Sequence, residues 1–155
     1  MDTDIRNPVI LIADDDPDDR LMIREAFAER CAHCQLYFVA NGVELMDYLR
    51  TSSSASEPAT DCPRPDLLLL DLNMPLKDGR QSLLEIRADP ALRTLPTVVL
   101  TTSRNDEDKV FCLAQGADGY IVKPSRYTEL LSIVTSLETY WNTSATQQPD
   151  SDNNA

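Results

Sequence analysis

The sequence feature that most constrains the fold is a leucine run interrupted by a single aspartate. Leucine occupies positions 67 to 70 and position 72, and Asp71 stands near the end of the run. A short segment that is apolar on both faces is typical of a strand in the middle of a parallel sheet covered by helices. In open α/β sheets, ligands bind at the carboxyl ends of the strands. Because a buried carboxylate is costly without a cation, Asp71 predicts a cation at this strand end.

Further short apolar runs alternate with helical patterns along the chain. We predict strands at residues 9–13, 36–39, 66–72, 97–101 and 119–122, and helices at about 17–30, from 42 onward, 80–88, 106–115 and 126–140. This alternation predicts a single α/β domain with a doubly wound, five-stranded parallel sheet. We expect the flavodoxin-like strand order 2-1-3-4-5, in which strands one, three, four and five become neighbours where the order reverses.

The segments outside these elements are polar. We place the folded domain at residues 8–141, between a flexible start at 1–7 and a disordered tail at 142–155. Residues 51–65 are rich in Ser, Ala and Pro, which predicts a long flexible loop. Because so few residues follow the last predicted helix, we expect no output domain there and expect output through protein contacts.

The charge of the chain restricts its partners. Of 155 residues, 14 are Lys or Arg and 26 are Asp or Glu, which gives a net charge of −12. Such a charge repels nucleic acids and anionic lipids, so we expect neither as a partner. No apolar run is long enough to cross a bilayer, and the first residues lack a basic region followed by an apolar one. We therefore expect a cytoplasmic protein.

Two of the four cysteines, Cys31 and Cys34, have the spacing of half a zinc site. The second half is missing, because no other cysteine pair exists and His33 is the only histidine. Gln35 follows the second cysteine, which excludes a haem-attachment motif. We interpret the pair as small, partly buried thiols near a helix end, with redox or metal use as the alternative.

Polar side chains stand at the carboxyl ends of the predicted strands that become neighbours. They are, in chain order, Asp14 and Asp15, Asp71, Thr101 and Lys123. Because the carboxyl ends of parallel strands meet at one edge of a sheet, we expect these side chains to share one cleft.

The chemistry of such a cleft is specific. Clustered carboxylates repel one another by about 1–4 kcal/mol per close pair. A hard divalent cation relieves this repulsion, and oxygen ligands with several waters suit Mg²⁺. A metal ion and the ammonium of Lys123 on either side of Asp71 would bind the oxygens of a phosphoryl group. Asp71 then serves as the nucleophile, and the Thr101 hydroxyl can donate to the phosphoryl group.

Each of these residues taken alone has a simpler explanation. Asp14 and Asp15 fit a solvated turn before a helix, Thr101 fits a helix cap, and Lys123 fits a surface lysine. Their coincidence at the ends of adjacent strands favours a functional site.

In these residues the chain resembles the receiver domains of two-component response regulators. The resemblance covers about residues 8 to 140, and its pieces are Asp14-Asp15, Asp71 with Asn73-Met74-Pro75 and Gly79, Thr101, and Tyr120-Ile121-Val122-Lys123-Pro124. It implies a signalling protein that accepts a phosphoryl group, and not an enzyme with substrates of its own.

The resemblance also implies specific roles. Asp71 is the phosphoacceptor and receives the phosphoryl group from a histidine of a sensor kinase. Mg²⁺ is held by Asp15 and Asp71, by Asp14 through water, and by the backbone carbonyl of Asn73. Lys123 contacts the phosphoryl group.

The implied switch lies on one face of the domain. Thr101 moves inward on phosphorylation and Tyr120 follows. A cis bond is implied between Lys123 and Pro124. The face formed by helix 106–115, strand 119–122 and helix 126–140 is implied to form a homodimer.

Within the family, the chain resembles the small stand-alone regulators of bacterial and cyanobacterial phytochromes. The resemblance rests on the Asp14–Arg20 segment, the long loop before the third strand, Leu100–Ser103 and the terminal Leu137–Trp141. We weigh two positions for Tyr140 and Trp141: they join the dimer face, or they cover the edge of the core.

Other functions fit the sequence less well. A phosphatase of the haloacid dehalogenase type places its nucleophile after the first strand and a second aspartate two residues later, whereas here Asp71 follows the third strand and Asn73 occupies the later position. A P-loop nucleotidase is excluded because the Gly-x-x-x-x-Gly-Lys pattern is missing. A degenerate receiver that only binds a partner would not need the complete set of polar residues.

Overall fold

The protein is a three-layer α/β domain, which we describe from a computed structural model over residues 7–53 and 62–141. Its five strands are all parallel and lie in the order β2-β1-β3-β4-β5, which confirms the predicted fold class. The strands are β1 (Val9–Ala13), β2 (Gln35–Val39), β3 (Leu67–Leu70), β4 (Thr97–Thr101) and β5 (Gly119–Val122).

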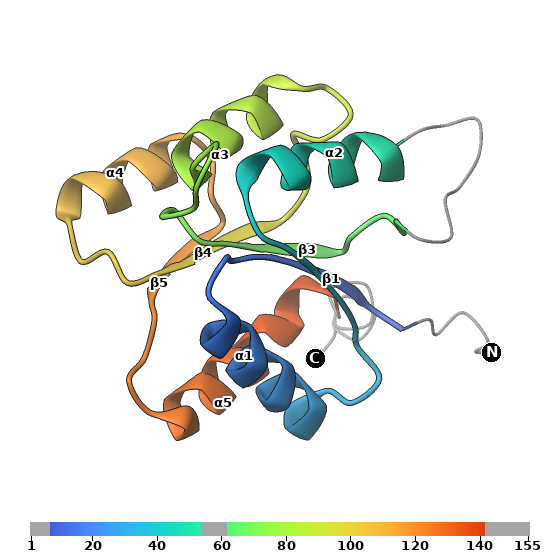
Figure 1. The fold of residues 1–155 in the computed structure, drawn as a ribbon, viewed down its shortest axis with the longest axis vertical. Helices are drawn as coiled ribbons and strands as arrows, with labels where there is room; N and C mark the ends of the chain where they lie inside the picture. Colours follow the sequence, from blue (N-terminus) through green and yellow to red (C-terminus); the bar gives the residue numbers. More distant parts are fainter. Residues whose placement is uncertain (1–6, 54–61, 142–155) are drawn as a thin grey trace, which may run out of the picture.

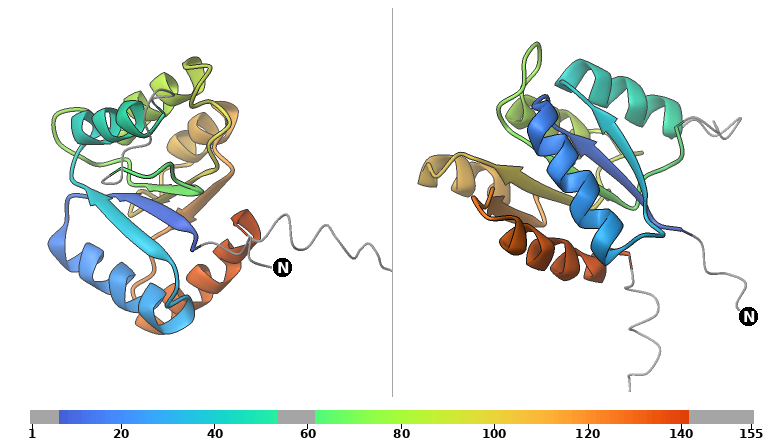
Figure 2. Two further views of the ribbon diagram at one scale, coloured as in Figure 1. Left: turned by 90° about the vertical axis from the view of Figure 1, so that its right-hand side faces the viewer. Right: turned by 60° about the horizontal axis from the view of Figure 1, so that its bottom comes forward.

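Helices cover both faces of the sheet. Figure 1 shows α2, α3 and α4 on one face and α1 and α5 on the other, and the views in Figure 2 agree. The helices are α1 (Pro17–Arg30), α2 (Gly42–Ser52), α3 (Gly79–Ala88), α4 (Asp106–Ala114) and α5 (Tyr127–Ser136), followed by a short 3₁₀ helix, η2 (Leu137–Tyr140). The last predicted helix therefore ends earlier than expected as an α-helix, and its final turn is the tighter 3₁₀ form.

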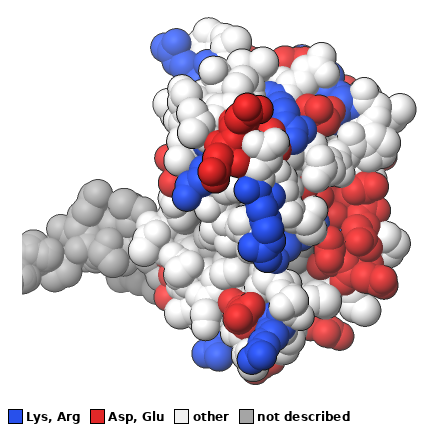
Figure 3. All heavy atoms as spheres, turned by 90° about the vertical axis from the view of Figure 1, so that its left-hand side faces the viewer, with Lys and Arg blue, Asp and Glu red and all other residues white. Residues whose placement is uncertain are grey.

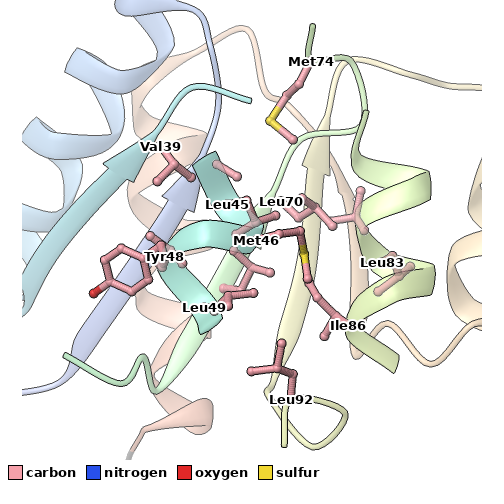
Figure 4. Packing of buried hydrophobic residues seen from close by; sticks show 14 of the residues in the cluster. Val39, Leu45, Met46, Tyr48, Leu49, Leu70, Met74, Leu83, Ile86 and Leu92 are labelled. Atoms are coloured by element: carbon pink, nitrogen blue, oxygen red, sulfur yellow. The ribbon is translucent and has the colours of Figure 1, made fainter. Parts of the chain in front are cut away.

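The leucine run supplies both halves of the core. Leu68 and Leu70 on β3 point into the cluster beneath α2, α3 and α4, whereas Leu67 and Leu69 point into the cluster beneath α1 and α5. Figure 4 shows the first cluster, where residues of α2 and α3 pack over Leu70. A strand buried on both faces explains why this segment has no polar alternation.

Side-chain caps determine where the helices begin. At α1 the Asp16 carboxylate accepts the backbone N–H of Asp18, and Pro17 occupies the first helical position. Asn41, Asp78 and Asn105 cap the three helices of the other layer in the same way. These caps begin α1, α2 and α4 within a few residues of a strand end, whereas residues 71–78 connect β3 to α3.

Trp141 covers the edge of the core, as one of its two predicted positions requires. Its ring lies 6.3 Å from the ring of Phe27 on α1, and it packs against the cluster beneath α1 and α5. The hydroxyl of Tyr140 donates to the carbonyl of Asp118 at 3.4 Å.

The prediction of free thiols at Cys31 and Cys34 is wrong, because the structure joins them in a disulfide. The turn after α1 places their Cα atoms 5.6 Å apart, within the usual range for a disulfide.

Several predictions concern segments that lie outside the described residues. These segments are 1–7 except for Asn7, the tail 142–155, and positions 54–61 of the predicted loop. In the part of the chain that the structure describes, none of the helices has the length and apolar character required to cross a membrane.

Candidate phosphoacceptor site

The register of the sheet brings the predicted site residues together. Ala13, the last residue of β1, pairs with Leu70, the last residue of β3, and the N–H of Asp71 donates to the carbonyl of Ala13 at 3.0 Å. On the other side, the N–H of Lys123 donates to the carbonyl of Thr101 at 2.8 Å. The carboxyl ends of four strands therefore open into the same cleft.

Three carboxylates form a cluster in this cleft. Oxygen atoms of Asp14, Asp15 and Asp71 all lie within 4.8 Å of one another. Asp14 and Asp71 are buried, with 2% and 6% of their surface exposed, whereas Asp15 is exposed. Among the described residues, Asp15 has no hydrogen bond or ion pair of its own.

This donor set fits a hard divalent cation. The three side chains offer only oxygen ligands, and the exposed position of Asp15 leaves one side of the cluster open to water. Mg²⁺ is held by one or two carboxylates and keeps several waters, so the arrangement suits it. Asn73, the predicted carbonyl ligand, is exposed just after Asp71, and its N–H donates to Asp71 Oδ1 at 3.2 Å.

Lys123, the residue that follows β5, reaches two of these carboxylates. Its Nζ lies 2.8 Å from Asp14 Oδ2 and 3.1 Å from Asp71 Oδ2. Burial alone lowers the pKa of Lys123, but its hydrogen bonds to Asp14 and Asp19 outweigh burial and raise the pKa above its ordinary value. Burial raises the pKa of Asp14, and the hydrogen bond from Lys123 opposes this shift. Lys123 is therefore a fixed positive charge beside Asp71.

A third partner of Lys123 was missed by sequence reasoning. Asp19 Oδ2 lies 2.6 Å from Lys123 Nζ, although Asp19 is not among the predicted site residues. A signal was present: Asp19 lies in the first turn of α1, only four residues after Asp15, which stands just past the end of β1.

Gly79 allows α3 to begin directly against the phosphoacceptor loop. Its N–H donates to the carbonyl of Leu72 at 2.9 Å. A Cβ at this position would overlap the carbonyl oxygen of Asp71 and would lie 2.8 Å from the Cα of Leu72. The glycine is therefore required by close backbone packing.

The predicted switch residues meet at Ser103. Thr101 is fully buried, and its Oγ1 accepts the N–H of Ser103 at 3.3 Å. The hydroxyl of Tyr120 donates to the carbonyl of Ser103 at 3.0 Å. Both residues thus contact the loop between β4 and α4.

An ion pair that the sequence did not reveal also joins this loop. Arg80 on α3 donates two hydrogen bonds, each 2.8 Å long, to the carboxylate of Asp108 on α4. The hydroxyl of Ser103 donates to Asp108 Oδ2 at 2.6 Å. The bonds from Arg80 and Ser103 lower the pKa of Asp108 to about 2.

The cis bond implied between Lys123 and Pro124 is not found: the peptide bonds of the described residues are trans. Trans is the intrinsically preferred form of an X–Pro bond, by about 0.5–1 kcal/mol.

Comparison with known protein families identifies the family of this chain. The family model of the response regulator receiver domain matches residues 10–135. The chain belongs to this family. It is a receiver domain of two-component signalling, a class of signalling proteins.

Relatives of this receiver domain include other response regulators. The response regulator Rcp1 of Synechocystis sp. is 33% identical over 141 residues, which cover 90% of this chain and 93% of Rcp1. The crystal structure of the phosphorylated cyanobacterial phytochrome response regulator RcpA is 37% identical with a TM-score of 0.77, and the match covers 90% of this chain and 97% of that chain.

A structure of the Mn²⁺-bound form of Rcp1 is 32% identical with a TM-score of 0.74, over 86% of this chain and 94% of that chain. This receiver domain is therefore homologous to a phytochrome response regulator, RcpA, and to Rcp1, whose crystal structure contains bound Mn²⁺.

Proposed function

We propose that this receiver domain accepts a phosphoryl group on Asp71 from a phosphohistidine of a sensor kinase. The observation that carries the proposal is the contact of Asp71 with Lys123 inside a cluster of three carboxylates. A carboxylate held by an ammonium and poised beside a cation site is suited to nucleophilic attack on phosphorus.

The transfer balances without any further reactant. A carboxylate oxygen of Asp71 forms a bond to phosphorus, the bond from phosphorus to the histidine nitrogen breaks, and the imidazole leaves with the electron pair. Lys123 neutralises charge on the transferred oxygens. Asp14, Asp15, Asp71 and the carbonyl of Asn73 would hold Mg²⁺, which when bound supplies positive charge to the phosphoryl oxygens.

Phosphorylation changes which contacts are available to the switch residues. It adds a charge of roughly −1.5 to −2 to the cleft. Thr101 lies at the end of β4, next to the cleft, and its hydroxyl would donate to the phosphoryl group. To donate this bond, Thr101 would move toward the phosphoryl group, which would alter its hydrogen bond with Ser103. Tyr120 also contacts Ser103. A ligand shifts a population only through such differential contacts.

The signal would leave the domain through protein contacts. We infer that the face formed by α4, β5 and α5 pairs with a second copy, because Val110 and Leu113 on α4 are exposed apolar side chains, with 66% and 44% of their surface accessible. The domain catalyses only its own phosphorylation and dephosphorylation.

The kinase would be a phytochrome. This pairing is supported by the likeness to RcpA, which is a phytochrome response regulator. Figure 3 views the molecule from the left of Figure 1, the side onto which the strand ends open, and shows acidic side chains gathered in one continuous group at an edge of this face. A kinase surface that docks there must tolerate or match this negative charge.

The test is intact mass after incubation with Mg²⁺ and acetyl phosphate. We expect one phosphoryl adduct on the wild type and none on Asp71→Asn. Asp47→Asn, which changes an exposed aspartate on α2 in the same way, is the matched control and should react like the wild type. An adduct that survives in Asp71→Asn, or its absence from folded wild-type protein, would refute the proposal. Size-exclusion chromatography of the same samples reports dimerisation.

A further inference from the structure

The Cys31–Cys34 disulfide lies at the end of α1 that is remote from the phosphoacceptor cleft. Cys31 follows the last residue of α1, and its N–H donates to the carbonyl of Phe27. Cys34 immediately precedes β2, and its N–H donates to the carbonyl of Cys31 at 3.0 Å. α1 begins at the cleft, so its length separates the disulfide from Asp71 (Figure 1).

The two sulfur atoms differ in access. Cys31 is buried, with 3% of its surface exposed, and packs in the cluster beneath α1 and α5. Cys34 is only partly buried at the edge of the same cluster. An external thiol therefore reaches Cys34 more readily than Cys31. The sulfur of Cys34 is then the one attacked, and the sulfur of Cys31 is the one that leaves.

His33 stands beside the leaving sulfur. Both of its ring nitrogens lie 3.7 Å from Cys31 Sγ, and its side chain is otherwise exposed. An imidazole near a cysteine stabilises the thiolate and can supply its proton. Since a better leaving thiolate accelerates exchange, the position of His33 favours opening of the disulfide at Cys34.

The disulfide contributes little to the stability of the domain. The stabilisation by a disulfide grows with the length of the closed loop, and this one joins residues only three positions apart. Backbone hydrogen bonds already hold the turn, including the one from the N–H of Gln35 to the carbonyl of Pro8 at 2.8 Å. Reduction should therefore leave the domain folded.

We propose that Cys31 and Cys34 form a thiol–disulfide exchange site that takes two electrons from a dithiol reductant. A thiolate of the reductant attacks Cys34 Sγ, the bond to Cys31 breaks, and Cys31 leaves as a thiolate that takes a proton from His33. The second thiol of the reductant then loses its proton and attacks the reductant's own sulfur in the mixed disulfide, and Cys34 leaves as a thiolate that takes up a proton. The reductant becomes a disulfide, and the protein gains two electrons and two protons.

The first test is a redox titration with mixtures of reduced and oxidised dithiothreitol. The protein carries Cys62→Ser, which removes the other partly exposed thiol, and is quenched with a maleimide in denaturant before its mass is measured. We expect a cooperative change from one adduct, on Cys112, to three. Two results would overturn the proposal. One is three adducts in every mixture, and the other is a single adduct after native protein has been incubated with excess reductant.

The second test addresses the roles of the three residues. In the Cys62→Ser protein, Cys31→Ser leaves Cys34 as the one thiol of the pair, and Cys34→Ser leaves Cys31. With glutathione disulfide as the probe, we expect Cys31, the buried thiol, to react at least about tenfold more slowly than Cys34. His33→Gln should slow reduction by dithiothreitol several-fold, and His33→Lys, which restores a positive charge, should recover part of the rate. Equal rates in all three His33 proteins would exclude the assigned role.

The exchange site is independent of the phosphoacceptor. Asp71→Asn should leave the redox titration unchanged, because that residue contacts none of Cys31, His33 or Cys34. A shift of the midpoint by more than the error of the titration would contradict this separation.

Discussion

The ammonium nitrogen of Lys123 lies 2.6 Å from a carboxylate oxygen of Asp19, which is closer than its 3.1 Å contact with Asp71. A lysine has three N–H donors, and here Asp14, Asp19 and Asp71 accept from all of them. A phosphoryl group on Asp71 must therefore displace one of these carboxylates from Lys123. Asp19 is the most exposed of the three, with 29% of its side chain accessible, and should be displaced first.

Asp19→Asn should increase the phosphorylated fraction. The substitution removes a negative charge that binds Lys123 in the unphosphorylated state, so the phosphorylated state gains in relative stability. One partly exposed charged contact contributes about 0.5–1 kcal/mol, which corresponds to an increase of about two- to fivefold in the ratio of phosphorylated to free protein. Intact mass at limiting acetyl phosphate measures this ratio.

The matched control is Asp18→Asn. Asp18 carries the same charge in the same turn of α1, is exposed, and its side chain does not contact Lys123. If both variants changed the ratio equally, the effect would come from net charge near the cleft and not from the Lys123 contact.

Asp15→Asn should weaken Mg²⁺ binding. The substitution replaces one of three clustered carboxylates with a neutral amide, and we expect a loss of at least about tenfold in affinity. Even mutation of a group that only hydrogen-bonds to a metal ligand lowers metal affinity about 10–100-fold. Isothermal titration calorimetry with MgCl₂ measures the affinity directly.

Asp16→Asn is the control for this experiment. Asn caps a helix as well as Asp does, so α1 should begin unchanged while a neighbouring negative charge is removed. Equal losses of Mg²⁺ affinity in both variants would indicate an effect of overall charge, and would argue against Asp15 as a ligand.

The sheet and the cleft were predictable because their signals are local. A strand buried on both faces must be apolar throughout, so Leu67 to Leu70 identified β3. Parallel strands with crossover helices place their carboxyl ends at one edge, so the sequence alone predicts that Asp14, Asp71 and Lys123 lie together.

The side-chain network was not predictable, because its partners are far apart in the sequence. Arg80 and Asp108 are 28 positions apart, and Asp19 and Lys123 are 104 apart. Charged residues on half-exposed helix faces follow no hydrophobic period, so only the packed structure pairs them. The spacing of Cys31 and Cys34 likewise suits thiols and a disulfide equally, and the turn after α1 decides between them.

Gly79→Ala should impair the site by steric overlap. The added methyl group would collide with the carbonyl oxygen of Asp71, so the loop or the start of α3 must shift. Overpacking of this kind costs about 1–3 kcal/mol, and it should outweigh the usual preference for Ala in a helix. Urea unfolding and the rate of phosphorylation by acetyl phosphate should both report the change.

Gly119→Ala is a matched control at the start of β5. A methyl group there would meet its nearest neighbours at 3.6–3.7 Å, which is ordinary contact distance. It should leave both stability and phosphorylation close to the wild-type values. Similar losses in the two variants would show that the overlap at Asp71 is not the cause.

The Asp108 carboxylate should add stability that depends on pH. Its pKa is lowered from 3.8 to about 2 by Arg80 and Ser103, so the folded state binds its proton less tightly than the unfolded state. A depressed pKa stabilises the fold above the unfolded value and loses this effect as pH falls through the folded value. The contribution should therefore be complete above about pH 4 and fade between about pH 4 and pH 2.

Urea unfolding of Asp108→Asn tests this dependence. At neutral pH we expect a loss of about 1.5–3 kcal/mol, as for hydrogen bonds to a charged group, and the difference from the wild type should shrink below about pH 4. Asp106→Asn, an exposed residue in the same first turn of α4, is the control and should show neither effect. A loss that stays constant with pH would contradict the assignment to the Asp108 carboxylate.

Val110→Glu should prevent pairing through the α4, β5 and α5 face. Val110 is 66% exposed on α4, and a buried carboxylate at the centre of an interface would be strongly unfavourable without a partner. We expect phosphorylated Val110→Glu to elute as a monomer in size-exclusion chromatography while it still forms the Asp71 adduct. Leu84→Glu places the same charge on an exposed apolar residue of α3, outside this face, and should still dimerise. Loss of the dimer in Leu84→Glu alone would instead place the interface on the α3 side of the domain.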